Sequence, residues 1–212
     1  MAEKSGKRRV LQSIALWLLP VIIIGGLFWP YLGFAVAGMM VFFLALAVFR
    51  GRFWCGWFCP RGAFLEVAMT PLSRRRKVPA LIRTTGFRWG VFVALMAFML
   101  LRVWQAGTVV EQLGFVFITM CILTTAIALP LSIAFQPRTW CVVCPMGTLQ
   151  GVLGGGREMV EIAESCIECG VCGETCPLDT YAGGHKAAGA VPNADCVKCR
   201  TCVDRCPKQA LR

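Results

Sequence analysis

The sequence contains a single histidine, His185, and no Cys-x-x-Cys-His motif. A haem held by two histidines is therefore excluded, and so is a covalently attached c-type haem. No Walker motif is present, and the glycines at 154–156 lack the spacing and the preceding strand of a dinucleotide-binding loop. Any redox chemistry of this chain must therefore use other cofactors.

Charged residues are also scarce, at 16% of 212 residues against 57% hydrophobic residues. The first 156 residues contain only three acids, Glu3, Glu66 and Glu111, but 15 of the 22 lysines and arginines. The basic residues flank apolar runs and do not alternate with aromatic residues in a stripe. We therefore expect them to orient the chain in a membrane, and we expect no nucleic-acid partner.

Four apolar runs, at residues 10–27, 31–49, 87–104 and 113–135, are long enough to cross a bilayer as helices. The N-terminus and the connection between the second and third runs are basic, whereas residues 28–30 and 105–112 contain no lysine or arginine. This asymmetry predicts a multi-pass membrane protein with both termini and all cluster cysteines on the cytoplasmic side.

Two cysteine elements follow the second and the fourth run. Cys55 and Cys59 lead into Pro60-Arg61-Gly62, and Cys141 and Cys144 lead into Pro145-Met146-Gly147. The membrane part thus reads as a two-fold repeat of helix, helix and Cys-Pro-x-Gly element. We expect a four-helix transmembrane domain at residues 1–150, a glycine-rich linker at 151–156 and a soluble domain at 157–212.

The soluble tail contains two Cys-x2-Cys-x2-Cys-x3-Cys-Pro motifs, a spacing typical of two [4Fe-4S] clusters in a small α+β ferredoxin-like fold. Three cysteines of each motif hold one cluster, and the fourth ligates the other cluster. Two four-cysteine zinc sites are the alternative, but structural zinc usually takes two separated cysteine pairs. The predicted ligands are Cys166, Cys169, Cys172 and Cys206 for cluster one, and Cys196, Cys199, Cys202 and Cys176 for cluster two.

The four cysteines of the membrane elements allow three interpretations. If the pseudo-symmetry brings them together, Cys55, Cys59, Cys141 and Cys144 supply the thiolates of a third iron-sulfur cluster. A redox-active dithiol or copper-type site and a purely structural role are the alternatives. The remaining cysteine, Cys121, lies alone in an apolar run and is interpreted as a packing residue.

In this order of elements the chain resembles the NapH family of membrane quinol dehydrogenase subunits, and it is similar to the membrane parts of NosR and CcoG. The likeness covers nearly the whole chain. It differs at the second pair, where two residues separate Cys141 from Cys144 and the family has three. The resemblance implies electron transfer from ubiquinol or menaquinol to a ferredoxin-like subunit or a multihaem cytochrome of a respiratory complex.

Several residues are candidates for contact with a quinone. Glu66 is the only acid close to the cysteine elements and is the candidate proton acceptor; the alternative is an exposed interfacial carboxylate. Arg102 with Glu111 offers a head-group site at the opposite face, or a side chain that extends to the interface. Further candidates are Arg61, beside a cluster or a phospholipid, and the possible pocket walls Trp54, Trp57 and Trp140.

The sequence thus favours an electron-transfer subunit that exchanges electrons with the quinol pool. A membrane-anchored ferredoxin adaptor without a quinone site is one alternative. A copper reductase or assembly factor similar to CcoG is the other.

Overall fold

The computed structural model describes residues 2–212, apart from the side chains of residues 2–6 and 193. Four helices are long and apolar enough to cross a membrane, which confirms the four expected spans. Large apolar side chains along them are exposed, as required of surfaces that face lipid. The helices are α1 (Ala2–Phe28), α2 (Leu32–Arg50), α6 (Thr85–Ala106) and α7 (Val110–Ala134).

Short helices follow α2 and α7 in the same order. The first pair is α3 (Phe53–Trp57) and α4 (Pro60–Ala68), and the second is α8 (Trp140–Val143) and α9 (Pro145–Leu153). Pro60 and Pro145 both occupy the first helical position, where a missing N–H costs nothing. The predicted repeat therefore has a structural counterpart. A further short helix, α5 (Ala80–Arg83), precedes α6.

The tail contains only short elements: α10 (Val171–Thr175), η1 (Ala182–Ala188), η2 (Asn193–Asp195) and α11 (Thr201–Asp204). In the described part of the chain the expected β component is limited to two isolated bridges, Glu161 with Ala190 and Ile162 with Leu211. The chain turns away after one or two paired residues to form the cysteine loops. The helical and iron-sulfur parts of the predicted fold class stand, but strands are not confirmed.

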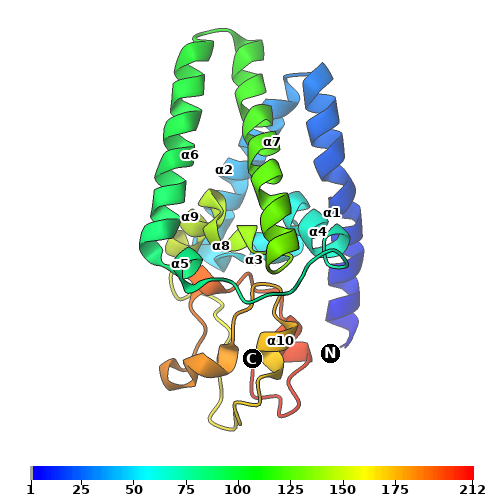
Figure 1. The fold of residues 1–212 in the computed structure, drawn as a ribbon, viewed down its shortest axis with the longest axis vertical. Helices are drawn as coiled ribbons and strands as arrows, with labels where there is room; N and C mark the ends of the chain where they lie inside the picture. Colours follow the sequence, from blue (N-terminus) through cyan, green and yellow to red (C-terminus); the bar gives the residue numbers. More distant parts are fainter. Residues whose placement is uncertain (1) are drawn as a thin grey trace.

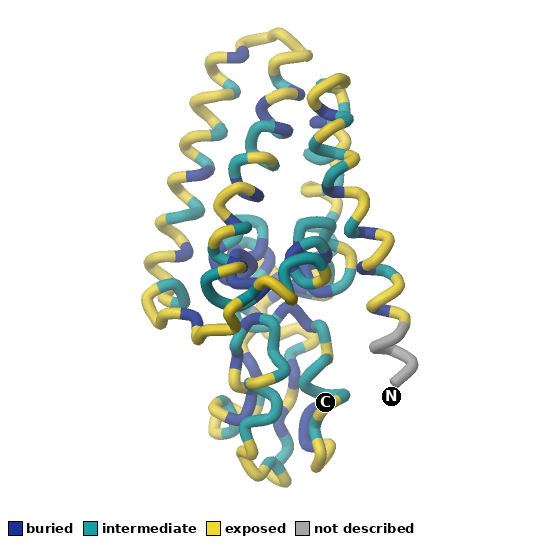
Figure 2. Tube along the Cα trace, turned by 45° about the vertical axis from the view of Figure 1, so that its right-hand side comes forward, coloured by how far each residue is buried: buried dark blue, intermediate teal, exposed yellow. Residues whose placement is uncertain are grey.

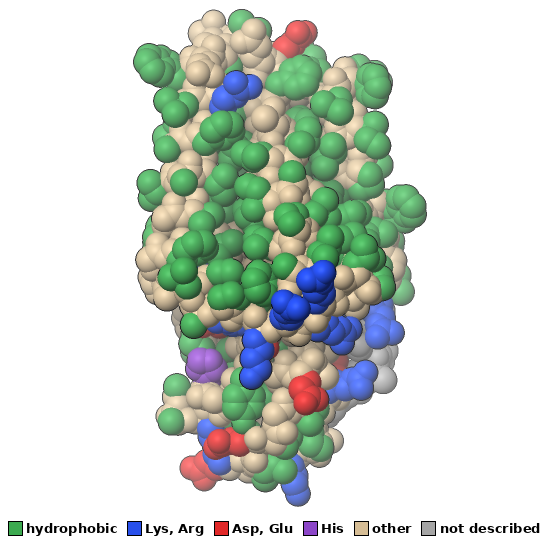
Figure 3. All heavy atoms as spheres, viewed as in Figure 1, with side chains coloured by type: hydrophobic (Ala, Val, Ile, Leu, Met, Phe, Trp, Pro, Cys, Tyr) green, Lys and Arg blue, Asp and Glu red, His purple; other side chains and the backbone are tan. Residues whose placement is uncertain are grey.

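The tail lies against one end of the helix bundle, and both chain termini are at that end (Figure 1). Apolar side chains cover the bundle, and most of the visible lysines and arginines lie below this apolar band (Figure 3). Buried residues concentrate where the short helices meet the tail (Figure 2). The junction is therefore a packed interface.

Arginines of the membrane part dock the tail. Arg83 donates hydrogen bonds to the carbonyls of Leu178 and Asp179, the latter at 2.8 Å. Arg88 donates to the carbonyl of Ala194 at 3.1 Å and pairs with the carboxylate of Asp195. Residues that the sequence analysis interpreted as orienting charges thus also hold the soluble part in place.

The segment expected to be a linker is shorter than predicted, because α9 continues to Leu153. Only residues 154–156 follow the helix. Gly154 packs against Gly51, so that an added Cβ would lie 2.4 Å from the Cα of Gly51. This contact fixes the start of the tail beside the end of α2.

Candidate functional site

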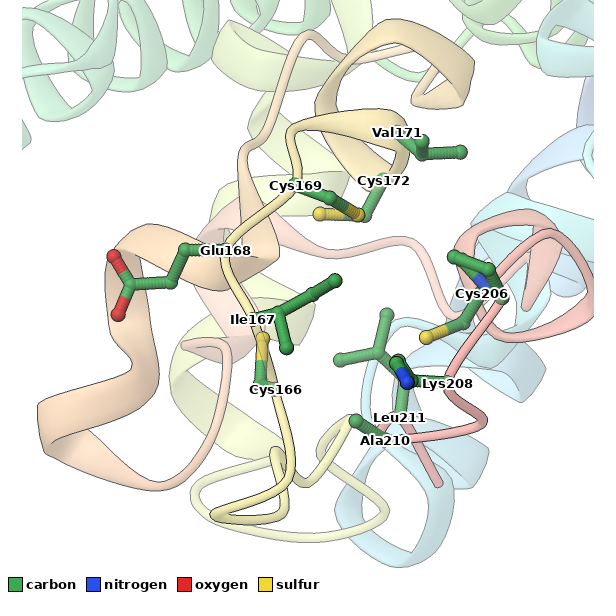
Figure 4. Close-up of a pocket in the computed structure, with 11 residues that line it drawn as sticks. Cys166, Ile167, Glu168, Cys169, Val171, Cys172, Cys206, Lys208, Ala210 and Leu211 are labelled. Carbon is green, nitrogen blue, oxygen red and sulfur yellow. The ribbon is translucent and has the colours of Figure 1, made fainter.

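One cavity in the tail is lined by all four cysteines predicted for cluster one. Cys166, Cys169 and Cys172 come from one loop, and Cys206 comes from the end of the chain. Their side chains line a cavity (Figure 4) with about 360 Å³ of space not filled by atoms, including its opening to solvent. The structure thus brings the remote fourth cysteine to the first triplet.

A second cavity, with about 390 Å³ of space not filled by atoms including its opening to solvent, is lined by Cys196, Cys199 and Cys202 together with Cys176. These are the four residues predicted for cluster two. Burial raises the pKa of Cys196 to about 11 and that of Cys176 to about 12. A thiolate here needs a compensating positive charge, which bound iron supplies.

The two cysteine loops share an unusual backbone. Positive φ angles occur at Glu168 and Gly170 in the first loop and at the corresponding Lys198 and Arg200 in the second. Such turns direct successive N–H groups inward and form anion-binding concavities, as in many iron-sulfur sites. The N–H of Lys198, for example, donates to the Sγ of Cys196 at 3.3 Å. The backbone therefore fits an anionic cluster.

In both tail cavities the thiols line the walls and do not meet at one point. Among the described residues, no three histidine, cysteine or acidic side chains converge on a position for a single metal ion. An arrangement around a cavity suits a group larger than one ion, and a cubane of four irons is such a group.

The two Cys-Pro elements meet at the junction with the tail. Cys55 and Cys141 are buried in one apolar cluster with Leu178 and Val197 of the tail. Burial raises the pKa of Cys55; Arg52 opposes this effect, and the other three thiols of the elements raise the pKa further. The four thiols of Cys55, Cys59, Cys141 and Cys144 are thus electrostatic neighbours.

Two buried arginines cross-link these elements. Arg52, three residues before Cys55, donates a hydrogen bond to the carbonyl of Cys141. Arg138, three residues before Cys141, donates to the carbonyl of Cys55 at 2.6 Å. Each arginine is only 1% exposed, and each element is therefore held by the other repeat.

The glycines of the Cys-Pro-x-Gly motifs leave room for these arginines. A Cβ on Gly62 would lie 3.3 Å from the guanidinium carbon of Arg138, and one on Gly147 would lie 2.6 Å from Nη2 of Arg52. Sequence reasoning missed both arginines, although each repeat carries the same signal, Arg-x-Trp-Cys, at residues 52–55 and 138–141.

Glu66 lies in an ion-pair network and is not an exposed carboxylate. It accepts from Arg8 at 2.6 Å and pairs with Arg138 at 2.5 Å. Burial alone would raise the pKa of Glu66, but the guanidinium groups of Arg138 and Arg8 hold it below its usual value. A lowered pKa disfavours a proton acceptor at neutral pH, so the structure supports a structural role.

The three candidate tryptophans and Arg102 do not lie together in one site. Trp54 lines a third cavity, which lies within the helix bundle. Trp57 instead donates from Nε1 to the carbonyl of Lys198 in the tail at 3.1 Å, and Trp140 is buried in the core of the bundle. Arg102 is exposed near the far end and donates to Gln105 at 3.4 Å, which fits a side chain extending to the interface.

Several known proteins similar to this chain are iron-sulfur or electron-transport proteins by name. A family model described as "4Fe-4S binding domain" matches residues 32–79 and 116–159. The first match contains α2 and the second contains most of α7, each with the Cys-Pro element after it, so each match covers the second helix and the cysteine element of one repeat. No solved structure matches the chain.

Several relatives carry descriptive names. The ferredoxin-type protein NapH of Escherichia coli is 24% identical over 95% of this chain and 71% of its own length. The putative electron transport protein YccM of Escherichia coli is 24% identical over 80% of the chain, and the methylamine utilization ferredoxin-type protein MauN of Methylorubrum extorquens is 28% identical over 68%. The matches span about half of those two proteins, 52% and 54%.

The matched segments contain the four cysteines of the membrane elements, whereas the two tail cavities with their eight cysteines lie outside them. The chain is similar to NapH-type membrane ferredoxin-type proteins, and the likeness supports iron-sulfur electron transfer.

Proposed function

We propose that this protein passes electrons between the quinol pool and a respiratory redox partner through a chain of iron-sulfur clusters. The observation that carries the proposal is the packing of one cysteine group on the next. Cys55 and Cys141 of the membrane elements share an apolar cluster with Cys176 and Cys199, which line the second tail cavity. A cluster at the membrane elements and a cluster in the second tail cavity would therefore be neighbours.

In this proposal the tail is a two-cluster ferredoxin-like domain at residues 157–212. Cluster one is held by Cys166, Cys169, Cys172 and Cys206, and cluster two by Cys196, Cys199, Cys202 and Cys176. The bound clusters take up and release single electrons. The protein supplies the inward-directed N–H groups, the apolar walls and the docking arginines that fix cluster two beside the membrane.

The cysteines of the membrane elements hold a third cluster. Two observations support this assignment: the thiols of Cys59, Cys141 and Cys144 each raise the pKa of Cys55, and the 4Fe-4S family model matches both elements. Arg52 and Arg138 place positive charge beside the site, which offsets the negative charge of four thiolates and raises the reduction potential of the cluster. The ligands are Cys55, Cys59, Cys141 and Cys144.

The proposed location of the clusters is the cytoplasmic face of a prokaryotic inner membrane. The basic connection before α6 lies at the end of the bundle that carries the tail. Lysine and arginine are enriched in cytoplasmic loops of membrane proteins. The partner, a ferredoxin-like subunit or a multihaem cytochrome, then receives or delivers electrons through the tail.

The experiment that tests the proposal follows cluster absorbance in anaerobically purified protein. A reduced menaquinol or ubiquinol analogue should bleach the clusters to a large part of the extent reached with dithionite. If dithionite bleaches them and neither quinol does, the protein is an adaptor without a quinone site. Iron should approach about twelve atoms per chain for three cubanes, and about eight would remove the third cluster.

A second candidate function is copper reduction, favoured by six methionines that line the cavity in the helix bundle. Thioether sulfur is a good ligand for Cu(I). Copper reduction that persists in quinone-depleted membranes, and disappears in a Cys55→Ser, Cys141→Ser variant, would support this function in place of quinol oxidation.

A further inference from the structure

The third cavity lies between all four long helices and comprises about 1020 Å³ of space not filled by atoms, including its opening. Its floor is formed by the starts of α4 and α9, with Pro60 and Pro145 at the first positions and Cys59 and Cys144 just before them. The cavity therefore borders the proposed third cluster. Its walls are apolar side chains of the membrane-spanning segments, so a lipid-soluble ligand can occupy it.

Many of the residues that line this cavity are methionines and cysteines, which carry sulfur. Methionine is unbranched and polarizable, and it adapts to flat or irregular apolar ligands, including aromatic rings. Leu19, Ile22 and Phe117 add ordinary apolar surface. Six of the nine methionines of the chain line the cavity, namely Met39, Met40, Met96, Met99, Met120 and Met146.

Arg61 is the one charged side chain that lines this cavity among the described residues. Its Nη2 lies 3.6 Å from the Sγ of Cys121, a weak acceptor, and its buried Nε has no hydrogen-bond partner in the described part of the chain. A guanidinium with so few acceptors is costly in apolar surroundings. The hydroxyl of Thr124, also in the wall, already donates to the carbonyl of Met120 at 2.6 Å. The cavity thus presents a donor without an adequate acceptor.

We propose that Arg61 binds a carbonyl oxygen of a quinone whose ring lies in this methionine-lined cavity, beside Cys59 and Cys144. The inference rests on the proposed function and names the residue that positions its substrate. A quinone fits because it combines an apolar ring and an isoprenoid tail with hydrogen-bond acceptors at the ring ends. The starts of α4 and α9 add partial positive charge at the same floor.

The redox step balances without a further reactant. A quinol loses two electrons and two protons and becomes a quinone; a cluster held by Cys55, Cys59, Cys141 and Cys144 would accept the electrons one at a time, passing the first on to the tail before it takes the second, and the protons would leave to water. Reduction of a quinone is the reverse. Arg61 stabilises the oxygen as it loses its proton and becomes negative, because the guanidinium remains charged. Glu66 lies outside the lining of the cavity and takes no part.

The two repeats supply an internal control. Arg61 and Met146 occupy the same position of the Cys-Pro-x-Gly motif, and both line the cavity. Only the first repeat carries a charge there. The proposed quinone is therefore bound asymmetrically, with one oxygen at the first repeat, although the surrounding scaffold is pseudo-symmetric.

The test measures the rate at which a menaquinol or ubiquinol analogue reduces the clusters of the purified full-length protein. Arg61→Met should lower this rate about tenfold to hundredfold, the effect of losing a hydrogen bond to a charged group, while dithionite bleaches the same absorbance as in wild type. Arg61→Lys should retain part of the rate. Arg76→Met removes an exposed arginine outside the cavity; it is the matched control and should stay within about twofold of wild type.

A double variant, Arg61→Met with Met146→Arg, moves the charge to the other repeat and should recover part of the rate. Met99→Trp fills the cavity without altering the cysteine elements and should also slow quinol oxidation, which keeps the test decisive if Arg61→Met loses its clusters.

The outcomes separate the two proposals. If wild type is not reduced by quinol but is by dithionite, the proposed function fails. If wild type is reduced and both Arg61→Met and Met99→Trp react at the wild-type rate, the quinone lies elsewhere and the cavity holds a lipid chain. If Arg61→Met binds Cu(I) more tightly and Met99→Trp leaves quinol oxidation unchanged, the cavity is a soft-metal site and the inference is overturned.

Discussion

The cysteine sites of the tail and those of the membrane part are built in different ways. In the tail, three ligands of each cavity come from one short loop and the fourth from the other motif. In the membrane part, each repeat supplies two cysteines, and an arginine of the opposite repeat holds each pair. Local spacing thus organises the tail sites, whereas contacts between repeats organise the membrane site.

The exchanged fourth ligand of the tail gives the largest expected effect. Cys206→Ser should remove about four irons per chain, because a cubane depends on all four thiolates. Its electron paramagnetic resonance spectrum should match that of Cys169→Ser and differ from that of Cys199→Ser. A match with Cys199→Ser would show that the fourth cysteines are not exchanged. Cys121→Ser is the control and should keep the full iron content.

Loss of an arginine cross-link between the repeats has the next largest expected effect. Arg138→Met should lower the free energy of unfolding by about 3–5 kcal/mol, because Glu66 and the carbonyl of Cys55 lose a buried partner. The iron content should fall by about four atoms, with the tail clusters retained. Iron analysis and thermal unfolding in detergent check both values. Retention of all iron in both Arg138→Met and Arg52→Met would show that the cross-links do not organise a cluster.

The Glu66 network predicts a pH dependence. Since the folded pKa of Glu66 lies below its ordinary value, its ionised form stabilises the fold at higher pH, and this contribution is lost as the pH falls through the folded pKa. Glu66→Gln should cost about 3 kcal/mol at pH 7. The difference from wild type should shrink below about pH 4, near the ordinary pKa of a glutamate. A difference that grows in acid would contradict the ion-pair assignment.

Gly62 and Gly147, at equivalent positions of the two repeats, should differ in how well they tolerate substitution by alanine. Gly147→Ala places a Cβ 2.6 Å from Nη2 of Arg52, whereas Gly62→Ala meets its nearest guanidinium atoms at 3.3 Å. We expect Gly147→Ala to lower the free energy of unfolding by about 1–3 kcal/mol, with Gly62→Ala the milder change. Equal melting temperatures for the two variants would show that the repeats are packed alike.

The smallest effect is expected at the junction of the two regions. Trp57→Phe removes the hydrogen bond to the carbonyl of Lys198 but keeps the ring, which should cost about 0.5–1.5 kcal/mol. Protease sensitivity of the tail should rise slightly, with unchanged iron content. Trp29→Phe, at an exposed residue of the far end, is the control and should leave protease sensitivity unchanged.

The sequence alone predicted the four membrane helices, because an uninterrupted apolar run of that length can satisfy its backbone hydrogen bonds in lipid in few ways other than as a helix. It also predicted the grouping of the eight tail cysteines around two cavities, since the ligand spacing of such motifs is tightly constrained. The β component of the predicted fold class is not confirmed in the described part of the chain, and the first residues of the expected linker lie in α9, because element boundaries depend on packing.

Only the tertiary structure decided what the polar residues near the membrane do. Arg52, Arg138 and Glu66 are far apart in the chain, and their roles follow from side chains that burial forces to find partners. The place of Arg61 was likewise decided by folding, because all four helices are needed to form the cavity that it lines. Spacing in a sequence specifies a local loop, but a buried charge is explained only by the neighbours that folding gives it.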